Sequence, residues 1–149
     1  MLSARADQKV LGYLGRALSL EFSAVQLYST QASLVASWGL EKEAAHFREE
    51  AVSELSHANR IIERMLANGV VPASSQLKPV ALAKSLDDII AIDMQFEQDL
   101  VVLYRSAFTH CTRNGDRENA QFFKALMDEE QVHFNELLEW QAQLQAGQA

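Results

Sequence analysis

Four segments of the sequence repeat apolar side chains every three or four residues, which is the spacing of one face of an α-helix. They cover residues 5–38, 41–68, 85–112 and 116–145. No alternating pattern of the kind found in half-buried strands competes with them. Each segment carries one apolar stripe, as the helices of a bundle do. The sequence therefore predicts an all-α fold, a four-helix bundle in a single domain over residues 1–149.

Local signals mark the ends of these helices. Gly39 in SWGLE is a helix stop, Asp116 in RNGD caps the helix after a tight turn, and Ser85 in SLDD is an N-cap. Residues 69–84 hold both prolines and no clear period, so they form one long loop. About 14 extended residues reach about 45 Å, which matches a helix of about 28 residues. The loop can therefore be one long crossover between helices 2 and 3, the ferritin-like connectivity.

A glutamate interrupts each of the four apolar stripes, and in the second and fourth helices a histidine follows three residues later. At that spacing both side chains lie on one face of the helix. The six residues are Glu21, Glu54, His57, Glu97, Glu130 and His133.

The glutamates have the same spacing in both halves of the chain, because Glu21 and Glu54 are as far apart as Glu97 and Glu130. Residues at one height of an antiparallel hairpin are symmetric about its turn. The midpoints fall at Trp38–Gly39 and Arg113–Asn114, where the turns are predicted. Each pair therefore lies level across its hairpin, about 25 Å from the turn. Tyr28 and Tyr104 each follow the first glutamate of a pair by the same interval, so the halves form a weak internal repeat.

Four carboxylates in an apolar interior need compensating charge, because an unpaired buried charge costs several kcal/mol. No Lys or Arg occupies these stripe positions, whereas two divalent cations would balance the four negative charges. Oxygen and imidazole ligands without thiolate suit iron or manganese. One Glu from each of two helices and Glu-x-x-His from each of two others is the ligand pattern of ferritin-like di-iron carboxylate proteins.

Several residues have an ordinary structural interpretation. Glu43 and His46 form a third Glu-x-x-His. Glu43 lies in the first turn of its helix, where the helix dipole favours an acid, so we do not interpret this pair as metal ligands. His46 and His110 are expected on the surface. Tyr28 is either a core residue or a participant in redox chemistry or in hydrogen bonding to a ligand. Asp93, one turn before Glu97, either supports a ligand or lies in solvent.

Composition narrows the possible binding partners and the cellular compartment. The formal charge of −7 argues against nucleic-acid binding and favours the attraction of cations. The lone cysteine, Cys111, fits a reducing compartment. The N-terminal residues lack the apolar core of a signal peptide, and no apolar run approaches the roughly 20 residues that span a bilayer. We therefore expect a cytoplasmic protein without a membrane partner.

From about residue 8 to about residue 140 the chain resembles the bacterioferritins. The segments EFSAVQLYSTQASLVASWGL (21–40), SELSHANRIIERML (53–66) and DEEQVH (128–133) match that family's pattern in place and order. The resemblance implies two iron ions per subunit, and manganese or a mixed pair of metals also fits the ligands. It also places Tyr28 next to the metal site. The implied terminal ligands are Glu21 and Glu97, the bridging ligands are Glu54 and Glu130, and the remaining ligands are His57 and His133.

Two positions depart from the family. The haem-ligating methionine of the family directly follows the first bridging glutamate, where this chain has Leu55, so no haem is expected. We expect no counterpart of the family's short fifth helix, since the segment 134–149 after His133 suffices to finish the fourth helix and little more. A homo-oligomer is expected, and a dimer, a mixed shell and a 24-subunit shell all stay open.

The resemblance implies a ferroxidase that oxidises Fe(II) to Fe(III) with O₂ or H₂O₂ for iron storage and detoxification. The alternative is a rubrerythrin-like peroxidase or a small di-iron oxidase that stores no iron. A third interpretation is a non-catalytic helical partner protein, which would need protons to neutralise its four buried glutamates.

Overall fold

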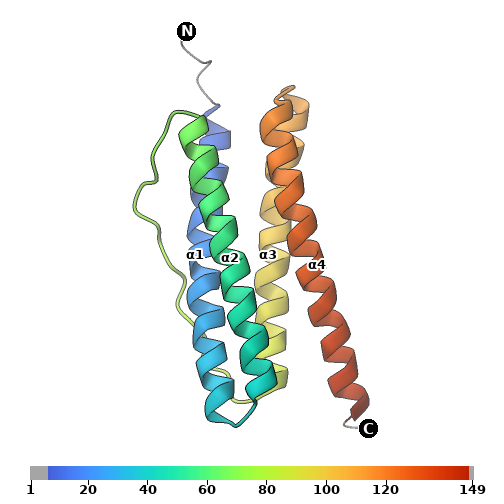
Figure 1. The fold of residues 1–149 in the computed structure, drawn as a ribbon. Helices are drawn as coiled ribbons and strands as arrows, with labels where there is room; N and C mark the ends of the chain where they lie inside the picture. Colours follow the sequence, from blue (N-terminus) through green and yellow to red (C-terminus); the bar gives the residue numbers. More distant parts are fainter. Residues whose placement is uncertain (1–6, 148–149) are drawn as a thin grey trace. The chain divides into compact units, whose positions relative to one another are not determined.

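The computed structural model describes residues 7–147, and this part of the chain holds four α-helices and no strand. The all-α prediction is confirmed. Within the described residues, none of the helices combines the length and the apolarity needed to cross a bilayer. The expected start of the first helix at residue 5 lies outside the described residues. The helices are α1 (Gln8–Ser37), α2 (Glu41–Ala67), α3 (Leu86–Arg113) and α4 (Arg117–Gly147), as Figure 1 shows.

Two predicted caps are present. The side chain of Ser85 accepts a hydrogen bond from the backbone N–H of Asp88 at 3.1 Å. The carboxylate of Asp116 accepts one from the backbone N–H of Asn119 at 3.2 Å and another from its side-chain amide at 2.7 Å. The two bonds from backbone N–H groups satisfy donors that the first turn of a helix leaves without an intrahelical partner. They fix where α3 and α4 begin.

The chain divides into two compact units, and the boundary lies between Val80 and Ala81. The first unit contains the hairpin of α1 and α2, and the second contains the hairpin of α3 and α4. Gly39 and Gly115 turn the two hairpins with φ angles of 82° and 71°, a conformation that favours glycine. Both turns therefore lie where the sequence places them.

Residues 68–85 connect α2 to α3 without a helix. In the first unit this loop runs beside α1 (Figure 1), because the Gln76 N–H donates to Ser19 Oγ at 3.1 Å and the Lys78 N–H donates to Ser23 Oγ at 2.9 Å. The loop thus travels in the same direction as α1, away from the end of α2. The predicted long connection between the second and third helices is present.

Aromatic packing fixes the register of the second hairpin. The ring centroids of Tyr104 on α3 and Phe123 on α4 are 6.3 Å apart, and both side chains are buried. These residues are symmetric about Arg113–Asn114, the midpoint that the sequence predicts. The same symmetry brings Glu97 level with Glu130.

Candidate metal centre

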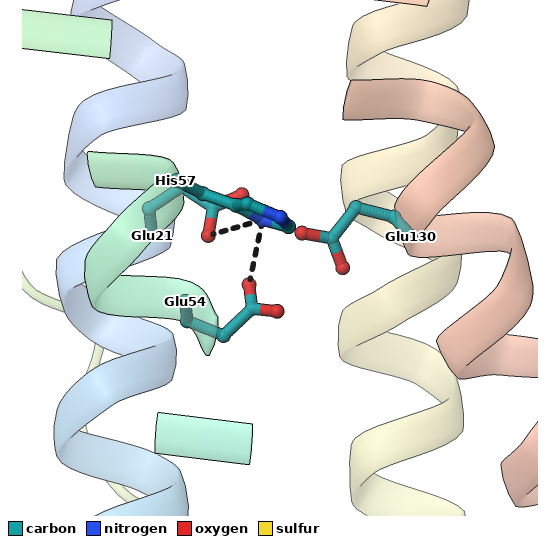
Figure 2. Close-up of side chains that lie close together, drawn as sticks. All are labelled: Glu21, Glu54, His57 and Glu130. Carbon is teal, nitrogen blue, oxygen red and sulfur yellow. Dashed lines mark ion pairs between the residues drawn. The ribbon is translucent and has the colours of Figure 1, made fainter. Parts of the chain in front are cut away.

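The first hairpin brings two glutamates and one histidine together, a set that we name the first triad: Glu21, Glu54 and His57. Nδ1 of His57 lies 3.5 Å from Oε2 of Glu21 on α1 and 3.8 Å from Oε2 of Glu54, one turn away on α2. Figure 2 shows both contacts as dashed lines. The two carboxylates are fully buried and the imidazole is 3% exposed. The structure therefore brings these three residues, which the sequence singles out, close together.

The second hairpin repeats the arrangement in the second triad: Glu97, Glu130 and His133. Nδ1 of His133 lies 3.8 Å from Oε1 of Glu97 on α3 and 3.4 Å from Oε2 of Glu130 on α4. Both carboxylates are fully buried, whereas the His133 side chain is 15% exposed. Each hairpin thus carries one Glu opposite one Glu-x-x-His.

The contacts in each triad fit a shared cation. Two ligands that each lie about 2.1 Å from one metal ion are about 3–3.5 Å apart. The four histidine–carboxylate distances run from 3.4 to 3.8 Å. One ligand atom from each member of the first triad lies within 4.8 Å of the other two. Small side-chain rotations therefore suffice to enclose a divalent ion, and the hard oxygen and imidazole ligands suit Fe(II) or Mn(II).

Protons compete with a cation at the first triad. Burial alone would lower the pKa of His57, but hydrogen bonds and charge from Glu21 and Glu54 raise it from 6.5 to about 10. Burial, and then the charge of Glu54, raise the pKa of Glu21 well above its ordinary value of 4.5. His57, with a pKa of about 10, therefore holds its proton at neutral pH until a cation displaces it, and the raised pKa of Glu21 favours protonation in the same direction. Cation binding should release protons and weaken as the pH falls.

The internal repeat extends beyond the ligands. The shift along the chain that relates Glu21 to Glu97 also relates Tyr28 to Tyr104. Both tyrosines are buried two turns after the first glutamate of their hairpin. The two hairpins therefore repeat each other in their buried tyrosines as well as in their candidate metal ligands.

One buried acid breaks this repeat. Asp93 on α3 is fully buried one turn before Glu97, so the solvent-exposed alternative is wrong. The corresponding residue of the first hairpin is Ala17, which is also buried. The second hairpin therefore has an additional acidic group that the first lacks, and its histidine is more exposed. Two cations held by the two triads would meet different surroundings.

Two further residues named from the sequence differ in exposure: Cys111 is buried and Leu55 is exposed. Cys111 is buried and is not part of a disulfide. Leu55 is 43% exposed on α2. An exposed leucine directly after Glu54 leaves this position without a group that can ligate haem iron.

Sequence reasoning missed one carboxylate near the first triad. A Glu50 oxygen lies within 4.8 Å of a Glu54 oxygen, one turn along α2. Glu50 also contacts His46 across one turn, with His46 Nε2 3.9 Å from Glu50 Oε1. His46 is half-buried rather than freely exposed. The four-residue spacing to Glu54 was the available signal, although the same spacing is common in surface pairs.

Comparisons with known proteins agree with this description. The ferritin-like domain pattern matches residues 11–146. Bacterioferritin from Rhodobacter capsulatus is 33% identical over 129 residues, which are 87% of this chain and 80% of that protein. Bacterioferritin from Brucella melitensis is 29% identical over 142 residues, 95% of this chain and 88% of that protein.

A solved structure of Rhodobacter capsulatus bacterioferritin matches with a TM-score of 0.91 and 30% identity, over 96% of this chain and 89% of that one. That structure is described with a metal-free dinuclear site and a haem iron. This chain belongs to the ferritin-like family. Its relatives within that family include bacterioferritins, so the resemblance seen in the sequence and the ferritin-like fold are both confirmed.

Proposed function

We propose that this protein is a di-iron ferroxidase of the bacterioferritin type, which oxidises Fe(II) for iron storage and detoxification. The observation that carries the proposal is the pair of buried triads, each with a histidine 3.4–3.8 Å from two carboxylates, in a chain of the ferritin-like family. The similarity to bacterioferritins supports a role in iron storage. A cytoplasmic homo-oligomer, at least a dimer, is part of the proposal.

Each ligand has a role in this proposal. Two of the glutamates would each bind one iron ion, two would bridge the ions, and one histidine would complete each coordination sphere. The carboxylates would favour Fe(III), the harder and more highly charged product. The glutamates that would each bind one ion are Glu21 and Glu97. The bridging glutamates would be Glu54 and Glu130, and the histidines would be His57 and His133.

The electron balance needs only Fe(II) and an oxidant. Two Fe(II) ions give up one electron each, and these two electrons with two protons convert O₂ to H₂O₂ or H₂O₂ to two water molecules. The proton displaced from His57 on cation binding can meet part of this demand. Tyr28, buried two turns from Glu21, is proposed to relay one of these two electrons or to donate a hydrogen bond near the centre.

Iron content and particle mass test the proposal together. We expect purified protein incubated with Fe(II) in air to bind two irons per subunit rapidly and then to accumulate many more as ferric mineral in a large oligomer. Metal analysis combined with light scattering measures both quantities. Saturation at two irons in a dimer would favour the peroxidase or oxidase alternative, and no bound metal would contradict both.

Haem binding gives a separate prediction. We expect the wild-type protein to show no haem absorption band after incubation with haem, because Leu55 cannot ligate iron. Leu55→Met places a thioether at this exposed position, so the variant should acquire a Soret band with sulfur-ligated iron. Absorption spectroscopy measures the gain, and Val52→Met, an exposed position three residues earlier on α2, is the matched control. A Soret band in wild-type protein that survives Leu55→Ala would exclude this position as the determinant.

A further inference from the structure

A small cavity in the second hairpin is lined by side chains of both α3 and α4. Its volume is about 100 Å³, and three polar and three apolar residues surround it. The lining residues are Gln98, Val101, Val102, Arg105, Gln131 and Phe134. None of the six candidate metal ligands is among them, so the cavity is not part of the candidate metal centre.

The four lining residues of α3 share one face of the helix, because their spacing is that of positions i, i+3, i+4 and i+7. Gln98 and Arg105 stand at the two ends of this face, with the valines between them. Val101 is buried, whereas Val102 is 50% exposed, so one valine forms the floor of the cavity and the other its rim. A long helical side chain leans towards the preceding turn, which directs the Arg105 guanidinium over this apolar floor.

The positive charge of Arg105 has no acidic partner. One turn away on α3 lie Val101, Val102, Phe108 and Thr109, none of which is an acid. Within residues 7–147 the guanidinium makes no ion pair and no hydrogen bond. Acidic residues outnumber Lys and Arg by 20 to 13 in this chain, so partners for an arginine are not scarce. A guanidinium offers a planar fork of donors that matches the two oxygens of a carboxylate.

The first hairpin lacks this combination of groups. The internal repeat relates Gln98 to Phe22, Arg105 to Ser29 and Gln131 to Leu55. A hairpin of this kind therefore does not need two amides and a guanidinium at these positions in order to pack. The Gln131 amide is also restrained, because its Nε2 donates a hydrogen bond to Asn135 Oδ1 at 3.0 Å.

We propose that this cavity binds a short aliphatic carboxylate of two or three carbon atoms, of which acetate and propionate are examples. Arg105 would bind the carboxylate, the amides of Gln98 and Gln131 would donate hydrogen bonds to it, and the apolar residues would contact the aliphatic part. An apolar cavity of about 150 Å³ holds benzene, so a volume of about 100 Å³ admits about four non-hydrogen atoms, as many as acetate has. This inference does not rest on the proposed ferroxidase function.

Calorimetric titration of metal-free protein with acetate, propionate and sulfate, each in turn, tests the size and chemistry of the site. Both carboxylates should bind saturably. Propionate should bind about fourfold more tightly than acetate, because it buries one more methylene group. Sulfate should bind at least about tenfold more weakly than propionate, because it has no aliphatic part to place against the valines and Phe134.

Two variants assign the contributions of charge and apolar contact. Arg105→Gln keeps the length of the side chain but removes its charge, and it should raise the Kd of propionate at least about tenfold. Arg113→Gln, which changes an exposed arginine at the end of the same helix, is the matched control and should bind as the wild type does. Val102→Thr keeps the shape of an exposed side chain but adds a hydroxyl, so it should bring the two carboxylates to within about twofold of each other.

Three results would each overturn the proposed site. They are the absence of saturable carboxylate binding to the wild type, an unchanged Kd in Arg105→Gln, and sulfate binding as tight as that of propionate. Equal affinities of the wild type for acetate and propionate would overturn the apolar contact and with it the choice of an aliphatic carboxylate.

Discussion

Replacing Glu54 or Glu130 with alanine is expected to abolish the rapid oxidation of Fe(II), a loss of at least about 100-fold. Changes to groups that merely support metal ligands cost about 10–100-fold in metal affinity or activity, so loss of a direct ligand should cost more. Each glutamate is fully buried beside the histidine of its triad. Each removal takes away one of two carboxylates that the histidine faces. Stopped-flow absorbance at two Fe(II) per subunit measures the effect.

The helices should survive these substitutions. Alanine is a good helix former, and removing Glu54 also removes the repulsion that raises the pKa of Glu21. Circular dichroism should therefore show unchanged helicity. Glu129→Ala, which changes the exposed neighbour of Glu130, is the matched control and should oxidise iron at the wild-type rate. Wild-type rates in both Glu54→Ala and Glu130→Ala would reject the two triads as the ferroxidase centre.

The sequence predicts the helices and the two triads because both depend on local spacing. Periodic apolar residues locate the helices, Gly39 and Asp116 locate the turns, and the equal separation of the glutamates in the two halves places each one level with its partner. A rigid helix that rises by about 1.5 Å per residue converts position in the chain directly into height. Grouping within a hairpin therefore needs no knowledge of long-range packing.

Local spacing does not predict whether a residue at the edge of an apolar stripe is buried. Asp93 and Glu50 lie beside the stripe, where a small rotation of the helix decides between solvent and interior. The spacing of such residues can be read from the sequence, but this rotation is set by neighbouring side chains. The prediction of a surface position for His46 misses its contact with Phe47 for the same reason. The burial of polar residues at the edges of helical stripes is thus what spacing along the chain does not determine.

Raising the pH should destabilise protein that has been stripped of metal. His57 has an ordinary pKa of 6.5 when unfolded and about 10 when folded, so its contribution to stability is complete below pH 6.5 and is lost as the pH rises towards 10. The raised pKa of Glu21 acts in the same direction from about pH 4.5 upward. Between pH 6.5 and 8 the loss from His57 is about 1–2 kcal/mol, or about 3–8 °C in Tm.

Bound Zn(II) should reverse this trend, because it replaces the protons that a higher pH removes. At about 1,000 times its Kd, one tightly bound ion adds about 4 kcal/mol, so two ions should raise Tm by more than about 10 °C at pH 8. The gap between loaded and stripped protein should widen from pH 6.5 to pH 8 in thermal melts. His57→Gln removes the titrating imidazole and should flatten the slope of the stripped protein, which separates this residue from surface histidines. If the Tm of the stripped wild type rises or stays constant over this range, the first triad does not hold its protons. That result would refute the competition between protons and cations at this triad.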